Sequence, residues 1–330
     1  MAALRAGLIG LGMMGRHHAR LLRSLDGVEL VAVADPVGDP HKVAGDLEVH
    51  KGVEELVAAG IDYCMVAVPT AYHEAVAIPL AEAGVHVMVE KPLAPDVAAA
   101  TRIAEAFEAR GLVGAVGHIE RYNPALQSMR TRIESGDIGE VYQITTRRQG
   151  PFPARIADVG VVKDLATHDI DLTSWVIQDP FVSVSARTAF RSGREHEDLV
   201  AVVGQLRAGV ITSHLVNWLS PFKERVTVVT GTKGAFVADT LTADLTFHAN
   251  GSMPTPWEDI ANFRGVSEGD VVRFGITKPE PLRTEHEAFR DAVLGKPADV
   301  VTMRQGLRTV AVAEAVLASA QEDRVVALPA

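Results

Sequence analysis

The feature that most constrains the fold is a glycine motif near the N-terminus. Residues 4–15 read as a short apolar run followed by Gly10-x-Gly12-x-x-Gly15, and apolar side chains then recur at helical spacing up to Leu25. The glycines therefore lie where a strand passes into a helix. Gly10 permits a tight turn, Gly12 lets the backbone approach a pyrophosphate, and Gly15 lets the helix pack closely on the strand. The helix N-terminus offers free N–H groups to phosphates. The turn predicted to bind the cofactor comprises Gly10, Gly12, Met13, Met14 and Gly15.

A second apolar stretch completes the pattern of a dinucleotide site. Residues 28–34 read as a strand that ends in Asp35, 20 residues after Gly15. A carboxylate at this point is suited to bind the ribose hydroxyls of NAD. Pro36 follows, and no arginine is adjacent to take a 2′-phosphate, so NAD is favoured over NADP. The alternative is a glycine-rich turn in an ordinary α/β protein. The combination of strand, glycines, helix, strand and acid favours NAD.

The chain changes its pattern near residue 120. Before it, strands and helices alternate, which predicts a doubly wound parallel sheet of the Rossmann type. After it, strands follow one another without helices between them, which predicts an α+β domain with an antiparallel meander. Those strands are expected at 141–147, 182–190, 199–206, 210–218, 225–230 and 241–248, with an irregular stretch at 251–282.

The predicted domains are therefore an NAD-binding domain over residues 1–120 and a substrate-binding and oligomerisation domain over residues 121–330. Helices expected at 284–294 and 303–319 are free to pack back on the first domain. The second sheet would leave one face open, either solvated or paired with another subunit. Its strands are strongly apolar, which favours a homodimer or homotetramer formed through this sheet.

Composition excludes several classes of partner. The length of 330 residues fits two domains, and the net charge of −10 without a Lys/Arg cluster argues against nucleic acid. No apolar run is long enough to predict a membrane span. The one cysteine, Cys64, cannot form an intrachain disulfide, and a reducing cytoplasm suits it best.

Polar residues follow three of the predicted parallel strands, where ligands of open sheets bind. Lys91 is the most informative, because a lysine at the end of a buried strand and before a proline is badly placed as a solvated surface charge. It could polarise a hydroxyl or take its proton; the alternative is a structural pairing with Glu90. The strand ends contribute Pro69, Thr70 and His73, then Glu90, Lys91 and Pro92, then Arg121, Tyr122 and Asn123.

A helix expected over 163–177 carries a second candidate group. Asp164 and His168 are four residues apart and so share a helical face. Histidine is the usual general base, and a carboxylate one turn away can orient it. A surface charge pair is the alternative, and a metal site would need a third ligand that the sequence does not place. Asp169 and Asp171 are expected to be structural or solvated.

Two further groups of polar residues have less specific interpretations. His17 and His18 are adjacent on the first helix, point in different directions and are interpreted as ordinary helix residues. Arg147, Arg148 and Arg155 flank the loop that begins at Gln149. They could bind a phosphate or carboxylate of a ligand, or could be solvated charges.

Taken together, these residues resemble the Gfo/Idh/MocA family of NAD(P)-dependent oxidoreductases over essentially the whole chain. The Glu90-Lys91-Pro92 tripeptide followed by the Asp164-x-x-x-His168-Asp169 helix is specific to that family. The resemblance implies a Rossmann domain joined to an open-faced, mainly antiparallel sheet through which subunits associate. It also implies that Lys91, Asp164 and His168 form the catalytic group.

A narrower likeness concerns the substrate. The stretch 117–125, with 148–153 and 158–162, resembles UDP-N-acetylglucosamine 3-dehydrogenases, which implies a nucleotide-linked amino sugar oxidised at C3. Arg121, Tyr122, Asn123, Arg148 and Arg155 would then hold the substrate. His168 is favoured as the base with Asp164 orienting it and Lys91 stabilising the oxyanion, and the reverse assignment stays open. An inositol, polyol or free-sugar dehydrogenase and a non-catalytic NAD-binding sensor are the alternatives.

Overall fold

The computed structural model describes residues 3–153, 159–251 and 268–329. The chain divides into two compact units. Unit 1 comprises Met1–Ile119 and Glu280–Glu314, and unit 2 comprises Glu120–Pro279 and Ala315–Ala330. Helix α9 (Met303–Glu322) contributes residues to both. Over the described ranges, no helix has the length and apolar character needed to cross a membrane.

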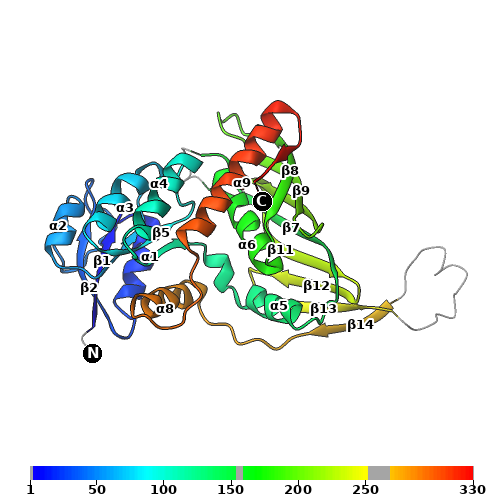
Figure 1. Ribbon diagram of the computed structural model, residues 1–330, viewed down its shortest axis with the longest axis horizontal. Coiled ribbons are helices and arrows are strands. Elements are labelled where there is room, and N and C mark those ends of the chain that lie inside the picture. Colours follow the sequence, from blue (N-terminus) through cyan, green and yellow to red (C-terminus); the bar gives the residue numbers. More distant parts are fainter. Residues whose placement is uncertain (1–2, 154–158, 252–267, 330) are drawn as a thin grey trace, which may run out of the picture. The chain divides into compact units, whose positions relative to one another are not determined.

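Unit 1 contains a six-stranded parallel sheet in the order β3-β2-β1-β4-β5-β6. Figure 1 labels its strands β1, β2 and β5. This order is that of the doubly wound dinucleotide-binding fold, so the predicted fold class is confirmed. The order in which successive strands join the sheet reverses between β1 and β4, and ligands of such sheets bind in the crevice beyond the carboxyl ends of these two strands. The strands are β1 (Leu4–Ile9), β2 (Val28–Ala34), β3 (Val49–His50), β4 (Tyr63–Val66), β5 (His86–Glu90) and β6 (Gly114–Gly117).

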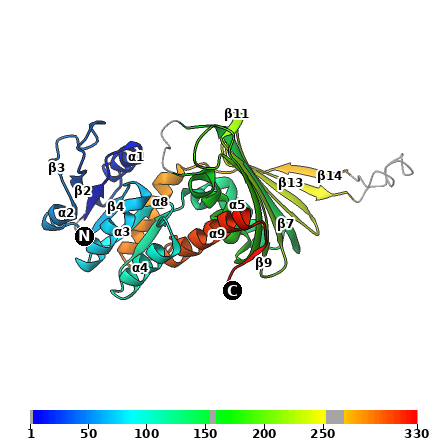
Figure 2. The same ribbon diagram turned by 90° about the horizontal axis from the view of Figure 1, so that it is seen from above.

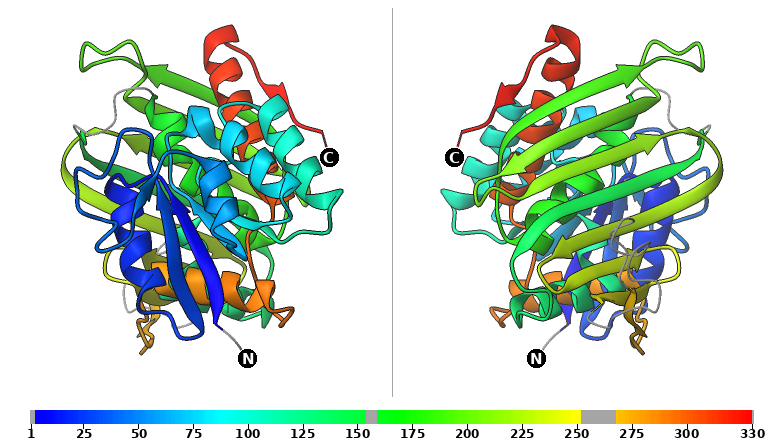
Figure 3. Two further views of the ribbon diagram at one scale, coloured as in Figure 1. Left: turned by 90° about the vertical axis from the view of Figure 1, so that its left-hand side faces the viewer. Right: turned by 90° about the vertical axis from the view of Figure 1, so that its right-hand side faces the viewer.

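Helices cover both faces of this sheet (Figure 3). One apolar cluster joins α2, α3, α4 and the start of α9 to one face, and a second joins α1 and α8 to the other. Strands buried on both faces explain continuous apolar runs such as residues 63–66. The bounds of these helices are α1 (Met13–Leu22), α2 (Val53–Ala58), α3 (His73–Glu82), α4 (Val97–Glu108) and α8 (Pro281–Val293).

Unit 2 is built on a nine-stranded sheet in the order β14-β13-β12-β11-β7-β10-β9-β8-β15. Only β7 and β10 run parallel among the pairs described; the other neighbours are antiparallel. The strands are β7 (Val141–Pro151), β8 (Phe181–Ala189), β9 (Leu199–Leu206), β10 (Ile211–Asn217), β11 (Leu219–Gly231), β12 (Gly234–Asp239), β13 (Asp244–Asn250), β14 (Glu268–Arg273) and β15 (Val326–Ala327).

The expectation of a simple meander was wrong. Strand β7, which precedes the others in sequence, lies between β10 and β11, because its alternating buried side chains Ile144, Thr146 and Arg148 fit the covered face at the centre of the sheet. Strands β12, β14 and β15 were not predicted. Strand β14 falls in the stretch expected to be irregular. Its short sequence does not predict a strand, and its pairing with β13 stabilises it as one.

The helices of unit 2 lie on one side of its sheet (Figure 2). They include α5 (Pro124–Glu134) and α6 (Thr167–Ile177), both with apolar residues buried against the sheet side. In β9, Val200 and Val202 are buried whereas Ala201 and Val203 are exposed. Within the described part of unit 2, the opposite face carries no helix (Figure 3, right).

Candidate functional site

The glycine turn between β1 and α1 is built from three glycines with different constraints. Gly10 has a φ of +94°, and a Cβ there would lie 2.5 Å from the Ala67 carbonyl. A Cβ on Gly15 would lie 2.0 Å from the Gly10 oxygen. Protein packing therefore requires both glycines. Around the Cβ position of Gly12 no atom lies within 4 Å, so the space that its missing side chain leaves is open to a ligand.

Asp35 lies beside this turn, at the end of β2. One carboxylate oxygen accepts a hydrogen bond from the Leu11 N–H at 2.8 Å, and the other accepts from the Val37 N–H at 2.9 Å. The side chain is thus held next to the glycine turn although it is 20 residues away in sequence. The turn and the carboxylate form the combination that a dinucleotide site requires. The open cradle at Gly12 and the uncapped N-terminus of α1 fit a pyrophosphate.

His73 links the loops that follow β4 and β5. Its Nδ1 lies 3.0 Å from the Pro92 carbonyl oxygen and its Nε2 lies 3.0 Å from the Val68 carbonyl oxygen. The ring is buried, and burial lowers its pKa despite these contacts. Both ring nitrogens are thus engaged with backbone, which assigns His73 to holding the loops. In the loop after β4, Pro69 is exposed and Thr70 is partly exposed.

The tripeptide Glu90-Lys91-Pro92 ends β5, and its Lys91–Pro92 peptide bond is cis. Glu90 is buried, and one of its carboxylate oxygens accepts a hydrogen bond from the Lys91 N–H at 3.0 Å. Lys91 itself is partly exposed. His18, which the sequence analysis interpreted as an ordinary helix residue, contacts the other carboxylate oxygen of Glu90.

The helix with Asp164 and His168 begins with an irregularity that the sequence did not reveal. Val162–Ala166 forms a π-helical turn, and the regular α6 starts only at Thr167. Turns of this kind occur frequently at functional sites because they widen the helix locally. Asp164 lies in the π turn and is buried, whereas His168 lies in the first turn of α6 and is partly exposed.

A buried carboxylate anchors this π turn. Glu197 accepts a hydrogen bond from the Val162 N–H at 3.0 Å, and its backbone oxygen accepts one from the Val161 N–H at 2.9 Å. A Cβ on Gly160 would lie 2.0 Å from the Glu197 carboxylate oxygens, so only glycine fits there. The sequence analysis did not single out Glu197, since a lone glutamate before a strand carries no specific signal.

Asp169 and Asp171 take part in buried ion pairs. Arg148 contacts Asp169 at 2.8 Å and Glu120 at 2.8 Å, and Arg121 holds both carboxylate oxygens of Asp171 at 2.7 Å. Although burial lowers the pKa of the Arg148 guanidinium, the charges of Asp169 and Glu120 outweigh it and keep the pKa above its usual value. Arg148 is therefore not a solvated charge, which was one of the two alternatives that the sequence left open.

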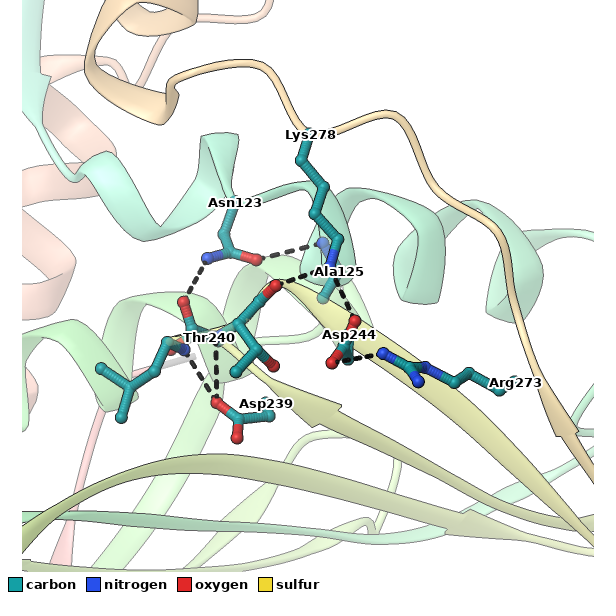
Figure 4. A network of polar contacts seen from close by, with 9 residues as sticks. Asn123, Ala125, Asp239, Thr240, Asp244, Arg273 and Lys278 are labelled. Carbon is teal, nitrogen blue, oxygen red and sulfur yellow. Dashed lines mark hydrogen bonds and ion pairs between the residues drawn. The ribbon is translucent and has the colours of Figure 1, made fainter.

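Asn123 begins α5 and is fully engaged with the backbone (Figure 4). Its Oδ1 accepts from the Ala125 N–H and its Nδ2 donates to the Thr240 carbonyl. In the same figure Asp244 pairs with Arg273 and Lys278, and hydrogen bonds from these groups lower the pKa of its carboxyl. This network ties the start of α5 to the turn between β12 and β13.

The other predicted substrate residues are spread more widely. Tyr122 is buried next to Arg121 in the turn Ile119–Tyr122. Arg147 is on the exposed face of β7 and pairs with Glu224 at 2.8 Å. Arg155 lies outside the described residues.

Comparison with known proteins relates both parts of the chain to one family. Residues 4–118 match the sequence model described as "Oxidoreductase family, NAD-binding Rossmann fold", and residues 126–237 match the "GFO/IDH/MocA C-terminal domain". Together the two matches span more than half of the chain, and the first agrees with the glycine turn and Asp35 in identifying NAD as the cofactor.

Curated relatives include dehydrogenases for two kinds of substrate. The scyllo-inositol 2-dehydrogenase (NAD(+)) of Bacillus subtilis is 33% identical over 192 residues, which cover 55% of this chain and 56% of the relative. The UDP-N-acetylglucosamine 3-dehydrogenase of Acidithiobacillus ferrooxidans is 35% identical over 176 residues, 52% of this chain and 54% of the relative. The chain thus matches little more than half the length of either relative. The solved structure of the latter aligns with a TM-score of 0.85 and 25% identity over 98% of this chain and 99% of that one.

Proposed function

The chain belongs to the Gfo/Idh/MocA family of oxidoreductases, and on that premise we propose that it is an NAD-dependent dehydrogenase acting on a secondary hydroxyl of a sugar or polyol. The observation that carries the proposal is the open cradle at Gly12 beside the Asp35 carboxylate. The cofactor supplies hydride acceptance when it is bound. Acid–base groups of the chain then supply the proton transfer that alcohol oxidation requires.

We assign the cofactor contacts to the edge of the sheet in unit 1. The backbone of the glycine turn binds the pyrophosphate and Asp35 binds the adenosine ribose. Direct contacts come from the exposed loop atoms after β4 and β5, whereas His73 and Glu90 act by holding those loops. The proposed set is Gly10, Gly12, Met13, Met14, Gly15, Asp35, Pro69, Thr70, His73, Glu90, Lys91 and Pro92.

We assign catalysis to Lys91, Asp164 and His168. His168 takes the hydroxyl proton while the hydrogen on the same carbon leaves as hydride, so that the alcohol becomes a ketone. Asp164 orients the imidazole, and the Lys91 ammonium stabilises the oxygen as negative charge develops on it. An assignment with Lys91 as the base uses the same three groups. Support comes from the buried anchoring of the π turn by Glu197, which fixes the start of the helix.

For the substrate we propose a nucleotide-linked amino sugar oxidised at C3. The support is the whole-length structural likeness to the UDP-N-acetylglucosamine 3-dehydrogenase. The inositol dehydrogenases are matched comparably well in sequence, so an inositol is the second candidate. We propose that Arg155 contacts the substrate directly, and that the buried residues Arg121, Tyr122, Asn123 and Arg148 support the site.

The test is NAD reduction followed by absorbance over a panel of UDP-sugars, free sugars and inositols, run in both directions. We expect turnover of a UDP-N-acetylamino sugar and none of the same sugar without the nucleotide; turnover of inositols alone would replace the first candidate by the second. His168→Asn should lower kcat at least about 100-fold while the Kd for NAD changes little, because general bases contribute that much. A chain that binds NAD but transfers no hydride to any member of the panel would be the sensor alternative.

A further inference from the structure

Unit 1 contains a buried chain of three side chains that ends at the backbone of Lys91. His286 of α8 places its Nε2 2.8 Å from Nδ1 of His18 of α1, and Nε2 of His18 lies 2.8 Å from Oε1 of Glu90. The other oxygen of Glu90 accepts from the Lys91 N–H at 3.0 Å. Both imidazoles are at least 99% buried, and Glu90 is 9% exposed. Two helices far apart in sequence thus meet at the residue before the proposed catalytic lysine.

We propose that His18 and His286 are positioning residues, which hold the Glu90 carboxylate and through it the backbone of Lys91 in the geometry that hydride transfer needs. This inference rests on the proposed function, since it assigns a role to residues behind Lys91. Neither histidine reaches the surface, so they act through Glu90.

The charges around the chain fix the direction of one hydrogen bond. Burial raises the pKa of Glu90, but the hydrogen bond and charge of His18, with the charge and N–H of Lys91, outweigh it and lower the pKa overall. An ionised carboxylate only accepts hydrogen bonds, so Nε2 of His18 carries the proton. The pKa of His286 is well below its ordinary value because of burial and of the charges of His18 and Arg20, so His286 stays neutral.

Loss of the His18 donor changes both the position and the charge of Glu90. A buried carboxylate that loses a donor retains its proton to higher pH, because burial then dominates. A protonated Glu90 holds the Lys91 N–H more weakly and withdraws a negative charge from beside the Lys91 ammonium. Since catalysis depends on placement within a fraction of an ångström, the effect appears in kcat.

Two variants test this hydrogen-bonded chain. His18→Leu removes the donor to Glu90, whereas His18→Gln keeps an amide Nε2 that can donate in its place. We expect His18→Leu to lower kcat about tenfold or more, to leave KM for NAD within about threefold, and to shift the acidic limb of the kcat–pH profile to higher pH. His18→Gln should recover most of the activity and the profile. Equal losses in His18→Leu and His18→Gln, or a loss without a pH shift, would overturn the inference.

A measurement on the wild-type chain decides the hydrogen-bond direction without any turnover or variant. Ring ¹⁵N NMR should show Nε2 of His18 protonated at every pH between about 6 and 9, as an ionised carboxylate partner requires. An unprotonated Nε2 would refute the proposed series of hydrogen bonds from His286 to Lys91. If no substrate of the panel reacts while the NMR result holds, the proposed function fails and the structural chain stands, so the two failures are distinguishable.

Discussion

Two glycines of the same turn should respond to alanine in opposite ways. At Gly15 the added methyl meets the Gly10 carbonyl oxygen at 2.0 Å, and this backbone atom cannot move without disturbing the turn. At Gly12 the methyl meets no protein atom within 4 Å, and the φ of −73° is accessible to alanine. We expect Gly15→Ala to destabilise unit 1 and Gly12→Ala to weaken NAD binding.

The magnitudes follow from the two environments. Overpacking against rigid neighbours costs about 1–3 kcal/mol, and the backbone clash at Gly15 belongs at the upper end, near 3 kcal/mol. For a domain of this size that lowers the midpoint of thermal unfolding by about 6–12 °C. Alanine in place of glycine at a helix N-cap costs about 1 kcal/mol, so Gly12→Ala should unfold within about 4 °C of the wild type.

The assays are thermal unfolding by circular dichroism without cofactor and calorimetric titration with NAD. Gly12→Ala should raise the Kd at least about tenfold, since the methyl occupies the space that the pyrophosphate would approach. Wild-type affinity in Gly12→Ala would refute the reading of that space as the phosphate cradle. Unchanged thermal stability in Gly15→Ala would refute the packing argument, whatever its effect on NAD.

Three further predictions concern unit 2. Burial lowers the pKa of His214 from 6.5 to about 4, so the native state resists protonation that the unfolded state accepts. The unfolding free energy should therefore fall as the pH drops below about 6.5, by about 2 kcal/mol at pH 5, and His214→Gln should flatten this dependence in urea titrations. Arg148→Met leaves the buried Asp169 carboxyl, whose pKa burial already raises, without its cation and should cost about 3–5 kcal/mol. Arg147→Met on the exposed face should cost under about 1 kcal/mol in the same titrations, and equal losses would contradict the buried ion pair. Val203, 54% exposed on the open sheet face, should tolerate glutamate in folding, yet Val203→Glu should reduce the mass found by light scattering if copies associate through this face.

The sequence predicted the first half of the fold well because local signals and tertiary demands agree there. Doubly buried strands require uninterrupted apolar runs, and a glycine follows each of the helices α1 to α4, at Gly27, Gly60, Gly84 and Gly111, where the chain turns back to a strand. The second sheet was predicted less well. The position of β7 depends on pairing with residues 68 to 90 positions later, and no local pattern records such partners.

The spacing of His18 in helix α1 is a signal of burial that the sequence analysis did not use. Gly15, His18, Ala19 and Leu22 form the buried stripe of α1 at helical spacing, and His18 occupies a position that an apolar residue would normally take. Its spacing alone indicates burial, and a buried histidine requires a polar partner. The partner could not be found in this way, because Glu90 and His286 lie on other elements.

In helix α6, two acidic residues that the proposed mechanism does not use lie beside the proposed catalytic His168. Asp169 is bound by Arg148 and Asp171 is bound by Arg121, and the two carboxylates project in different directions around α6. Two buried ion pairs on separate sides add directional contacts to the apolar packing of the helix and so favour one rotation of the helix about its axis. His168 directly precedes Asp169, so its direction is set by the same constraint. Buried charge contributes little net stability, and we propose that its role here is the placement that His168 would need as a general base.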